Sequence, residues 1–480
     1  MTGIQAEKCQ AEDAGRRRKQ EEKRLRRRLD MTLMPVILLM LLFQFLDKGA
    51  LGAAKINGIE PDLHIHQRQF NTATASWTIG YMLFQIPSNL LITRVHPGRY
   101  LSFWVFAWSV VGLCHAFVHS FSGLMTVRFF LGVSDAPFFV GATHLLSSWY
   151  TTREMALRMS ILFGCLIISL TLVGPLSASI FSGLDGKLGW RGWRWLYLIF
   201  GLGGLFIAAV GLVFLPSYPT CTKKPWWLTS EQKSVGKVRM DEDRVGEKKV
   251  NHNKLWDGFK DACKDKRTWM FVLLLTCRRS FEGIHIYLPS LIQSLIPTIL
   301  LHPARQMSLE TTTLLLTSPP AFLGALATIA SGYSSDRRSE RCFHIIVPVL
   351  LALIGLIITA STLNSVARYV ATFLYIPGSV AGSAMAWIWV TSSLNETAEK
   401  KACGIAIVSV ASGFGGIWSP FLFQGRDKPQ YLLAFIALSC FAVLEVVCCW
   451  GVRVLLKKGN ARLNSEAEER GEADVRLYVL

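Results

Sequence analysis

Long apolar stretches separated by short polar turns recur along most of the chain. A helix needs about 20 mostly apolar residues to cross the hydrocarbon core of a bilayer, and only helices and closed barrels satisfy every backbone polar group there. The stretches of this length fall near residues 33–56, 71–94, 100–118, 122–148, 158–182, 193–215, 269–292, 309–333, 343–362, 367–392, 402–423 and 430–455. The pattern predicts an all-α membrane protein with twelve transmembrane helices.

The longest polar insert, residues 217–268, divides the predicted spans into six and six. A short basic turn follows the second span of each half, at residues 94–99 and again at residues 332–341, as in transporters built from two related halves. We therefore expect two pseudo-symmetric six-helix bundles. The expected parts are a basic cytoplasmic tail (1–32), a first bundle (33–216), a cytoplasmic linker (217–268), a second bundle (269–455) and a cytoplasmic tail (456–480).

Composition supports this assignment and excludes other classes of protein. Of the 480 residues, 51% are hydrophobic and 18% are charged, whereas soluble domains carry about 25% charged residues. A soluble enzyme, a nucleic-acid-binding module and a disordered scaffold are therefore excluded. The spans and the linker contain no metal-ligand or nucleophile–base pattern, so we expect no cofactor, no metal site and no nucleic-acid partner.

The net charge of +18 comes from basic residues in loops and tails. Most of them fall in segments on the same side as the amino terminus, and positively charged loops mark the cytoplasmic side of a membrane. We expect both termini in the cytosol, with the protein in the plasma membrane as a monomer. The first 30 residues are dense in Lys and Arg, and they either form a disordered tail or bind anionic lipid.

Ionisable residues inside the predicted spans are the candidates for function, because each costs about 2.5–3.5 kcal/mol at the centre of a helix on insertion scales. An organic anion needs a fixed cation in a cavity of low dielectric constant, and Lys48, Arg278 and Arg279 are the candidate cations. Coupling to protons needs a carboxylic acid whose proton affinity changes with its surroundings. Asp47 and Asp135 fit this role.

These charged residues also have structural interpretations. Arg128 and Asp135 are seven residues apart and share a helical face, so they can form a pair that stabilises the bundle. Arg278 and Glu282 have the i, i+4 spacing of a pair that neutralises itself on one helix.

The second predicted span carries a polar stripe at i, i+4 and i+8, formed by Tyr81, Gln85 and Asn89. Such a stripe is costly where it faces lipid. It either lines a cavity, where it offers hydrogen bonds to a substrate, or it joins neighbouring helices. We expect Tyr81 and Gln85 to lie on a cavity wall and to contact the substrate.

Several motifs resemble the major facilitator superfamily. The turn Gly332-x-x-x-Asp336-Arg337-x-x-x-Arg341 resembles its signature loop, and Arg128-x-x-x-Gly132 resembles its second motif. Longer stretches are similar to its anion:cation symporter family, and most of all to the fungal pantothenate, biotin and allantoate permeases. These stretches are Leu46-Asp47-Lys48, Trp77-Thr78-Ile79-Gly80-Tyr81, Gln85-Ile86-Pro87-Ser88-Asn89-Leu90, Ser148-Trp149-Tyr150-Thr151 and Gly192-Trp193-Arg194-Trp195.

The resemblance implies the major facilitator fold and roles for individual residues. Asp135, seven residues after the motif arginine, occupies a position associated with proton coupling in that family. Lys48, next to the acidic residue of the first span, occupies a position associated with binding a substrate carboxylate. Structural or gating roles fall on the motif residues Arg128, Asp336, Arg337 and Arg341.

The combined prediction is a secondary active transporter, and not an enzyme. It moves a small organic anion, vitamin-like or carboxylate-like, across a membrane by alternating access, with protons as the coupling ion in symport. Two alternatives stay open at this point. One is an exporter of a fungal secondary metabolite, and the other is a nutrient sensor that keeps the fold without transport.

Overall fold

The computed structural model describes residues 2–92, 95–218, 226–243, 255–295, 308–338, 340–394 and 398–470, and the side chains of most of them. The first half contains α1 (Thr2–Ile56), α3 (Gln67–Ile92), α4 (Pro97–Cys114), α5 (Phe121–Ser147), α6 (Thr152–Leu184) and α7 (Gly192–Phe214). The short helix α2 (Ile59–Asp62) and the 3-10 turns η1 (His115–Phe117) and η2 (Lys187–Gly189) lie in its loops.

The second half contains three helices broken at glycines and three continuous ones. The broken helices are α10 (Lys266–Glu282) with α11 (Ile284–Gln293), α15 (Ser365–Ala381) with α16 (Ser383–Ser393), and α17 (Ala398–Ser412) with α18 (Phe414–Leu422). The continuous helices are α13 (Leu309–Arg338), α14 (Cys342–Ser361) and α19 (Leu432–Arg470), and the turn η4 (Gly425–Asp427) precedes the last. Between the halves lie α8 (Ser230–Asp243) and α9 (Leu255–Lys264).

The fold is the expected set of twelve spans in two halves. Within the described ranges, ten helices are long and apolar enough to cross a membrane. The other two spans are α3, which carries the polar stripe, and the broken helix α10–α11, which carries Arg278, Arg279 and Glu282. The prediction of an all-α membrane protein is therefore confirmed.

The same packing pattern occurs in both halves. In the first half α3 packs on α5, α4 on α7 and α1 on α7, and in the second half α13 packs on α15, α14 on α19 and α10 on α19. Each helix thus has the neighbours of the helix six spans later. The halves meet where α6 packs on α13, α3 on α18 and α1 on α11.

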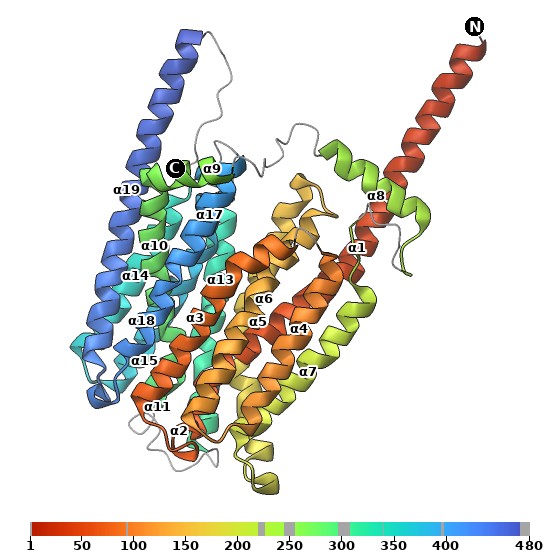
Figure 1. The fold of residues 1–480 in the computed structure, drawn as a ribbon. Helices are drawn as coiled ribbons and strands as arrows, with labels where there is room; N and C mark the ends of the chain where they lie inside the picture. The colour runs from red at the N-terminus through yellow and green to blue at the C-terminus, as the bar shows by residue number, and fades with distance from the viewer. Residues whose placement is uncertain are drawn as a thin grey trace.

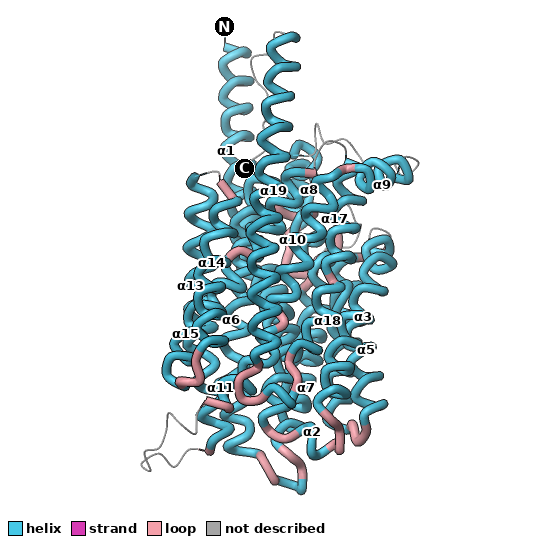
Figure 2. Tube along the Cα trace, turned by 90° about the vertical axis from the view of Figure 1, so that its left-hand side faces the viewer, coloured by secondary structure: helices cyan, strands magenta, loops and turns pink. Residues whose placement is uncertain are grey.

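Both described chain ends lie at one end of the bundle, together with α8 and α9, and we call it the linker end (Figure 1). The opposite end is called the distal end. Helices α1 and α19 extend past the linker end in both views (Figures 1 and 2). Helix α1 is continuous across residue 32, where the composition changes from basic to apolar. Residues 219–225 and 244–254 of the predicted linker, and 471–480 of the predicted tail, lie outside the described residues.

Contacts between the halves close the distal end. The ammonium of Lys55 on α1 lies 4.6 Å from the ring centroid of Phe70 and 4.9 Å from that of Tyr287, which belong to different halves. It also pairs with Glu60 at 3.4 Å. Asn71 accepts a hydrogen bond from the Tyr287 hydroxyl at 2.7 Å. The two halves are therefore joined at this end by buried polar contacts.

Two glycines set the close approach of α3 and α5. A Cβ atom on Gly80 would collide with the carbonyl of Phe129, and one on Gly132 would collide with the carbonyl of Trp77. Small residues allow this backbone-to-backbone contact between membrane helices. The contact fixes the height of Trp77 against the middle of α5.

Each linker helix is attached to its own half. Helix α8 packs on α1, whereas α9 packs on α17. Near α9, Asp265 caps α10 by accepting a hydrogen bond from the backbone N–H of Arg267 at 2.9 Å, and it pairs with Lys400 at 2.8 Å. Burial acts to raise the pKa of Asp265, but the hydrogen bonds from Arg267 and Lys400 outweigh it and hold the pKa below its ordinary value.

Replacing Asp265 with Asn is expected to lower the melting temperature of the purified protein by about 2 °C at pH 7. Asn keeps the helix cap but loses the charge that pairs with Lys400 and Arg267. A carboxylate with a lowered pKa stabilises the fold above its unfolded-state pKa, so the difference persists down to about pH 4 and disappears only below it. The exposed Asp261→Asn on α9 is the control, and an equal loss there would refute the role of the ion pair.

Candidate functional site

Trp77 on α3 joins a cation and an acid from two other helices. Its indole N–H donates a hydrogen bond to a carboxylate oxygen of Asp135 on α5 at 2.9 Å. The ammonium of Lys48 on α1 lies 4.2 Å from the centroid of the same ring, within the range of a cation–π contact. Asp135 is 3% exposed, whereas Lys48 is partly exposed. The predicted cation and the predicted acid therefore contact the same aromatic side chain, the cation at the face of the ring and the acid at the indole N–H.

The polar stripe of α3 continues from this group. The ring of Tyr81 stacks on Trp77 with 5.3 Å between centroids, and Tyr81 is partly exposed. Gln85 donates a hydrogen bond to the Ser409 hydroxyl of α17 at 2.7 Å, while its amide oxygen is buried and lacks a partner among the described residues. Tyr81 thus lies beside the candidate cation, and Gln85 lies at a contact between the halves.

Arg279 enters the same region from the second half. Its side chain is 38% exposed and pairs with Glu282 at 3.3 Å, and Glu282 also accepts a hydrogen bond from Ser383 at 2.8 Å. Lys48 of the first half interacts electrostatically with both Arg279 and Glu282. One cation from each half therefore contributes to a shared charged region between the halves.

Arg278 lies apart from this region. It is 1% exposed and forms an ion pair with Glu445, which is fully buried on α19. It also donates to the backbone carbonyl of Ser379 at 3.1 Å, next to the break at Gly382. A Cβ atom on Gly382 would lie 2.7 Å from the Arg278 guanidinium. This arrangement supports the broken helix α15–α16, and the i, i+4 pair with Glu282 considered from the sequence is not formed.

Arg128 and Asp135 do not form the pair that their spacing allows. Arg128 is 2% exposed and donates to the hydroxyl of Tyr197 on α7 at 2.5 Å. The Tyr197 ring stacks on His115 with 4.6 Å between centroids. Asp47 interacts electrostatically with Arg128 and Asp135. Asp47 is 4% exposed and its carboxylate lies against Gly112 of α4, so it lies inside the first half. One of its oxygens lacks a partner among the described residues.

The predicted gating turn lies at the linker end. Arg341 donates a hydrogen bond to Ser392 at the end of α16 at 2.9 Å, and Arg337 is exposed. The side chain of Asp336 lies outside those described. The neighbouring Glu340 pairs with Arg453 of α19 at 2.9 Å. This turn therefore links α13, α16 and α19 of the second half.

Sequence reasoning missed two residues that organise the site. Trp77 stood within a quoted motif, but an aromatic residue in an apolar helix gives no sign that its N–H meets a carboxylate. Glu445 did give a signal, because it is a lone acid inside the apolar stretch at 430–455, and such a residue needs a partner.

The arrangement is better suited to binding an anion than to catalysing a covalent reaction. Lys48 and Arg279 are partly exposed cations on different halves. Lys48 interacts with the carboxylates of Asp135 and Glu282, and Arg279 pairs with Glu282. An anionic group placed between them would replace interactions that each cation now makes within its own half. A small anion bound between Lys48 and Arg279 would contact both halves at once.

The chain matches the sequence pattern of the family described as "Major Facilitator Superfamily" over residues 37–420. It is 29% identical to the "MFS-type transporter cnsO" of Penicillium expansum, over 86% of this chain and 79% of the relative. It is 26% identical to the "Major facilitator-type transporter hxnP" of Emericella nidulans, over 95% of this chain and 91% of the relative.

Solved structures share the fold at low sequence identity. A bacterial homologue of the human lysosomal transporter Spinster, described as inward-facing and unoccupied, aligns with a TM-score of 0.66 at 14% identity, over 88% of this chain and 97% of that one. The xylose transporter XylE from E. coli, in a partially occluded inward-open conformation, aligns with a TM-score of 0.65 at 15% identity, over 87% and 96%. These similarities concern the fold.

Because Arg278 is buried and Arg279 is partly exposed, loss of their ion pairs is expected to affect stability differently. Glu445→Gln leaves the buried Arg278 without its counter-charge, which costs about 3–5 kcal/mol, and we expect the melting temperature to fall by about 5 °C or more. Arg279→Gln removes only a partly exposed pair, worth about 1 kcal/mol or less, so we expect a fall of about 2 °C or less. Thermal unfolding of both purified variants checks this, and the reverse order of stabilities would contradict the assignment.

Proposed function

The chain belongs to the Major Facilitator Superfamily and is a membrane transporter rather than an enzyme, and on this premise we propose that it carries a small organic anion by proton-coupled symport. The observation that carries the proposal is the position of Lys48 between Trp77 and the second half. In this proposal the anion binds between Lys48 and Arg279. Tyr81 and Gln85 contribute polar contacts on the wall of the site.

Binding of the anion between the halves explains how it would drive their movement. Lys48 belongs to α1 of the first half and Arg279 to α10 of the second. A carboxylate that accepts hydrogen bonds from both side chains would draw the two halves together at the level of the proposed site, away from the contacts at the distal end. A planar guanidinium can hold a carboxylate through two parallel hydrogen bonds, while the ammonium of Lys48 contributes a point charge. Arg278 is assigned a structural role, because its donors are directed to Glu445 and Ser379.

In the proposed mechanism, protonation of Asp135 couples binding of the proton to binding of the substrate anion. While Asp135 is charged, its negative charge offsets that of Lys48 through the shared Trp77. When Asp135 binds a proton, the positive charge of Lys48 is available for the substrate anion. Binding of the anion and of the proton therefore favour each other, as linkage requires. Asp47, which interacts electrostatically with Asp135, is proposed as a second proton-binding group.

We propose carboxylates as the substrate class on the ground of the motif resemblance to fungal pantothenate, biotin and allantoate permeases, which Leu46-Asp47-Lys48 carries in the first span. The excess of basic residues at the linker end supports a cytoplasmic location of that end. The proposal also places the protein in the plasma membrane as a monomer. The closed distal end then corresponds to a conformation that is shut toward the outside. A conformation of this kind takes up substrate after the halves rock apart at the distal end.

Asp135→Asn is expected to separate binding from coupling. The Asn side chain resembles the protonated acid, so exchange of labelled for unlabelled substrate persists, while accumulation driven by a pH gradient falls about 100-fold or more. Proteoliposomes supplied with radiolabelled pantothenate, biotin or allantoate measure both activities. Asp257→Asn on α9, which removes an exposed carboxylate at the linker end and outside the proposed site, is the matched control.

Two outcomes would contradict the proposal. If Asp135→Asn accumulates the transported acid as the parent protein does, Asp135 is not the coupling group. If the parent protein exchanges none of these acids and binds them without transport, a sensor function replaces the proposed one.

A further inference from the structure

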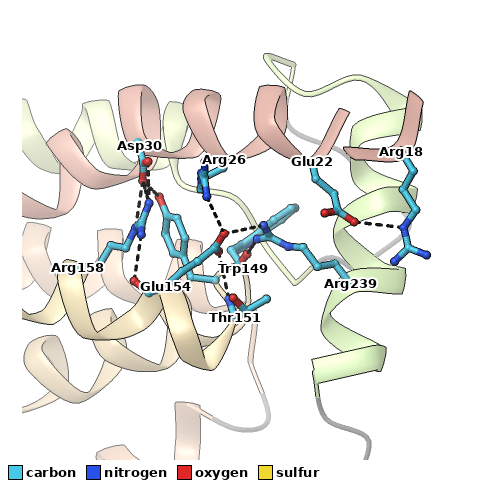
Figure 3. Close-up of polar contacts among 10 residues, drawn as sticks. Arg18, Glu22, Arg26, Asp30, Trp149, Thr151, Glu154, Arg158 and Arg239 are labelled. Carbon is cyan, nitrogen blue, oxygen red and sulfur yellow. Dashed lines mark hydrogen bonds and ion pairs between the residues drawn. The ribbon is translucent and has the colours of Figure 1, made fainter. Parts of the chain in front are cut away.

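A basic groove lies at the linker end, outside the spans and away from the proposed transport site. Its volume is about 570 Å³, and it is bounded by the extension of α1, the start of α6 and the end of α8. Figure 3 shows the polar contacts around it, with α1 crossing above the start of α6. The groove is lined by Lys19, Glu22, Lys23, Arg26, Thr151, Glu154 and Arg239.

The lining carries an excess of positive charge. It has four cations against two carboxylates, and both carboxylates already have arginine partners. Glu22 pairs with Arg18 at 3.2 Å, and Glu154 pairs with Arg239 at 3.2 Å and with Arg26 at 3.7 Å. In the part of the chain that the structure describes, Lys19 and Lys23 are exposed and have no ion-pair partner. The groove thus has about two positive charges to spare.

Arg239 gives the groove a fixed donor. It is 7% exposed, and its guanidinium donates to the backbone carbonyl of Trp149 at 2.6 Å and to Glu154 at 3.2 Å (Figure 3). Its Nε atom is buried without a partner among the described residues. The Arg239 guanidinium is therefore held in place by its two acceptors and keeps one donor unused.

A further ion pair, beside the groove, joins α1 to α6. Arg158 of α6 pairs with Asp30 of α1 at 2.7 Å (Figure 3). The Tyr150 hydroxyl donates to the same carboxylate at 2.8 Å. Burial and the charge of Asp30 raise the pKa of Tyr150, which keeps it a hydrogen-bond donor. The α1 extension is therefore anchored on α6 beside the groove, about one helical turn after Arg26.

We propose that this groove binds the phosphomonoester of an anionic lipid headgroup, of the kind found on a phosphatidylinositol monophosphate. A phosphomonoester carries about −1.5 to −2 charges at pH 7, which matches the spare charge of the groove. Clusters of basic residues beside a membrane helix attract such lipids, and arginine suits the oxygen geometry of phosphate.

The position of the groove favours a lipid over a soluble ligand. Arg26 precedes Leu33, the first residue of the apolar span of α1, by seven residues, which is about 10 Å along the helix. The headgroup layer is about 6 Å thick, so a phosphate on the far side of an inositol ring reaches the groove while the acyl chains stay in the bilayer. Bound there, the headgroup holds α1, α6 and α8 together as one unit of the first half.

Purified full-length protein tests the proposal in native mass spectrometry with short-chain phosphatidylinositol monophosphate, short-chain phosphatidylinositol and the deacylated monophosphate headgroup. We expect the monophosphate lipid to bind about tenfold or more tightly than phosphatidylinositol. The double variant Lys19→Gln/Lys23→Gln, which removes two exposed cations and no ion pair described in the structure, is expected to abolish this preference. The matched control, Arg16→Gln/Arg17→Gln, removes the same charge outside the groove and is expected to keep it.

Equal binding of the two lipids by the unaltered protein would overturn the proposal, as would a preference that survives loss of Lys19 and Lys23. Binding of the deacylated headgroup as tight as that of the lipid would also overturn it, because the ligand would then be a soluble phosphomonoester. None of these readouts depends on transport, so the result stands apart from the test of the proposed function.

Discussion

The contact of Trp77 with both Lys48 and Asp135 is the interaction on which the proposed mechanism depends. A lysine in the middle of a membrane bundle needs compensation, and here it is shared between an aromatic face and a nearby acid. The indole N–H directs Asp135 toward this group, and the ring covers Lys48. The close packing of α3 on α5 at Gly80 and Gly132 holds the arrangement in place. A bulkier residue at either glycine would move Trp77 and separate the proposed proton site from the proposed anion site.

The two halves share a packing pattern but differ in the continuity of their helices and in the charged residues that they contain. The first half has continuous helices and contains Lys48, Asp135 and the buried group around Arg128. The second half has three helices broken at glycines, and its buried ion pair of Arg278 with Glu445 stabilises one of these breaks. Adjacent residues on a helix point about 100° apart, so Arg278 faces the core of its own half when Arg279 faces the other half. Two neighbouring arginines therefore have different roles.

Much of the fold could be predicted from the sequence, because a membrane-spanning helix is determined mainly by the apolar residues of its own segment. The apolar length of each stretch, the short polar turns between the stretches and the polar insert predicted the twelve spans and the two halves. The ionisable residues of the spans were also identifiable, since each is costly in lipid. Their partners were not, because pairs such as Arg128 with Tyr197 join different helices, and helix-to-helix register cannot be read from one sequence. Spacing along one helix suggested pairs with Asp135 and Glu282 that three-dimensional packing replaced.

The most direct test of the central claim is the pH dependence of uptake by Trp77→Phe in proteoliposomes. Phenylalanine keeps an aromatic face for Lys48 but has no N–H for Asp135. Substrate affinity at acidic pH is expected to change by less than about threefold. The pH of half-maximal uptake is expected to move upward, because the charged carboxylate loses its hydrogen-bond donor. An unchanged pH profile with a weaker affinity would instead show that Trp77 only forms a wall of the site, and that the acid and the cation act independently.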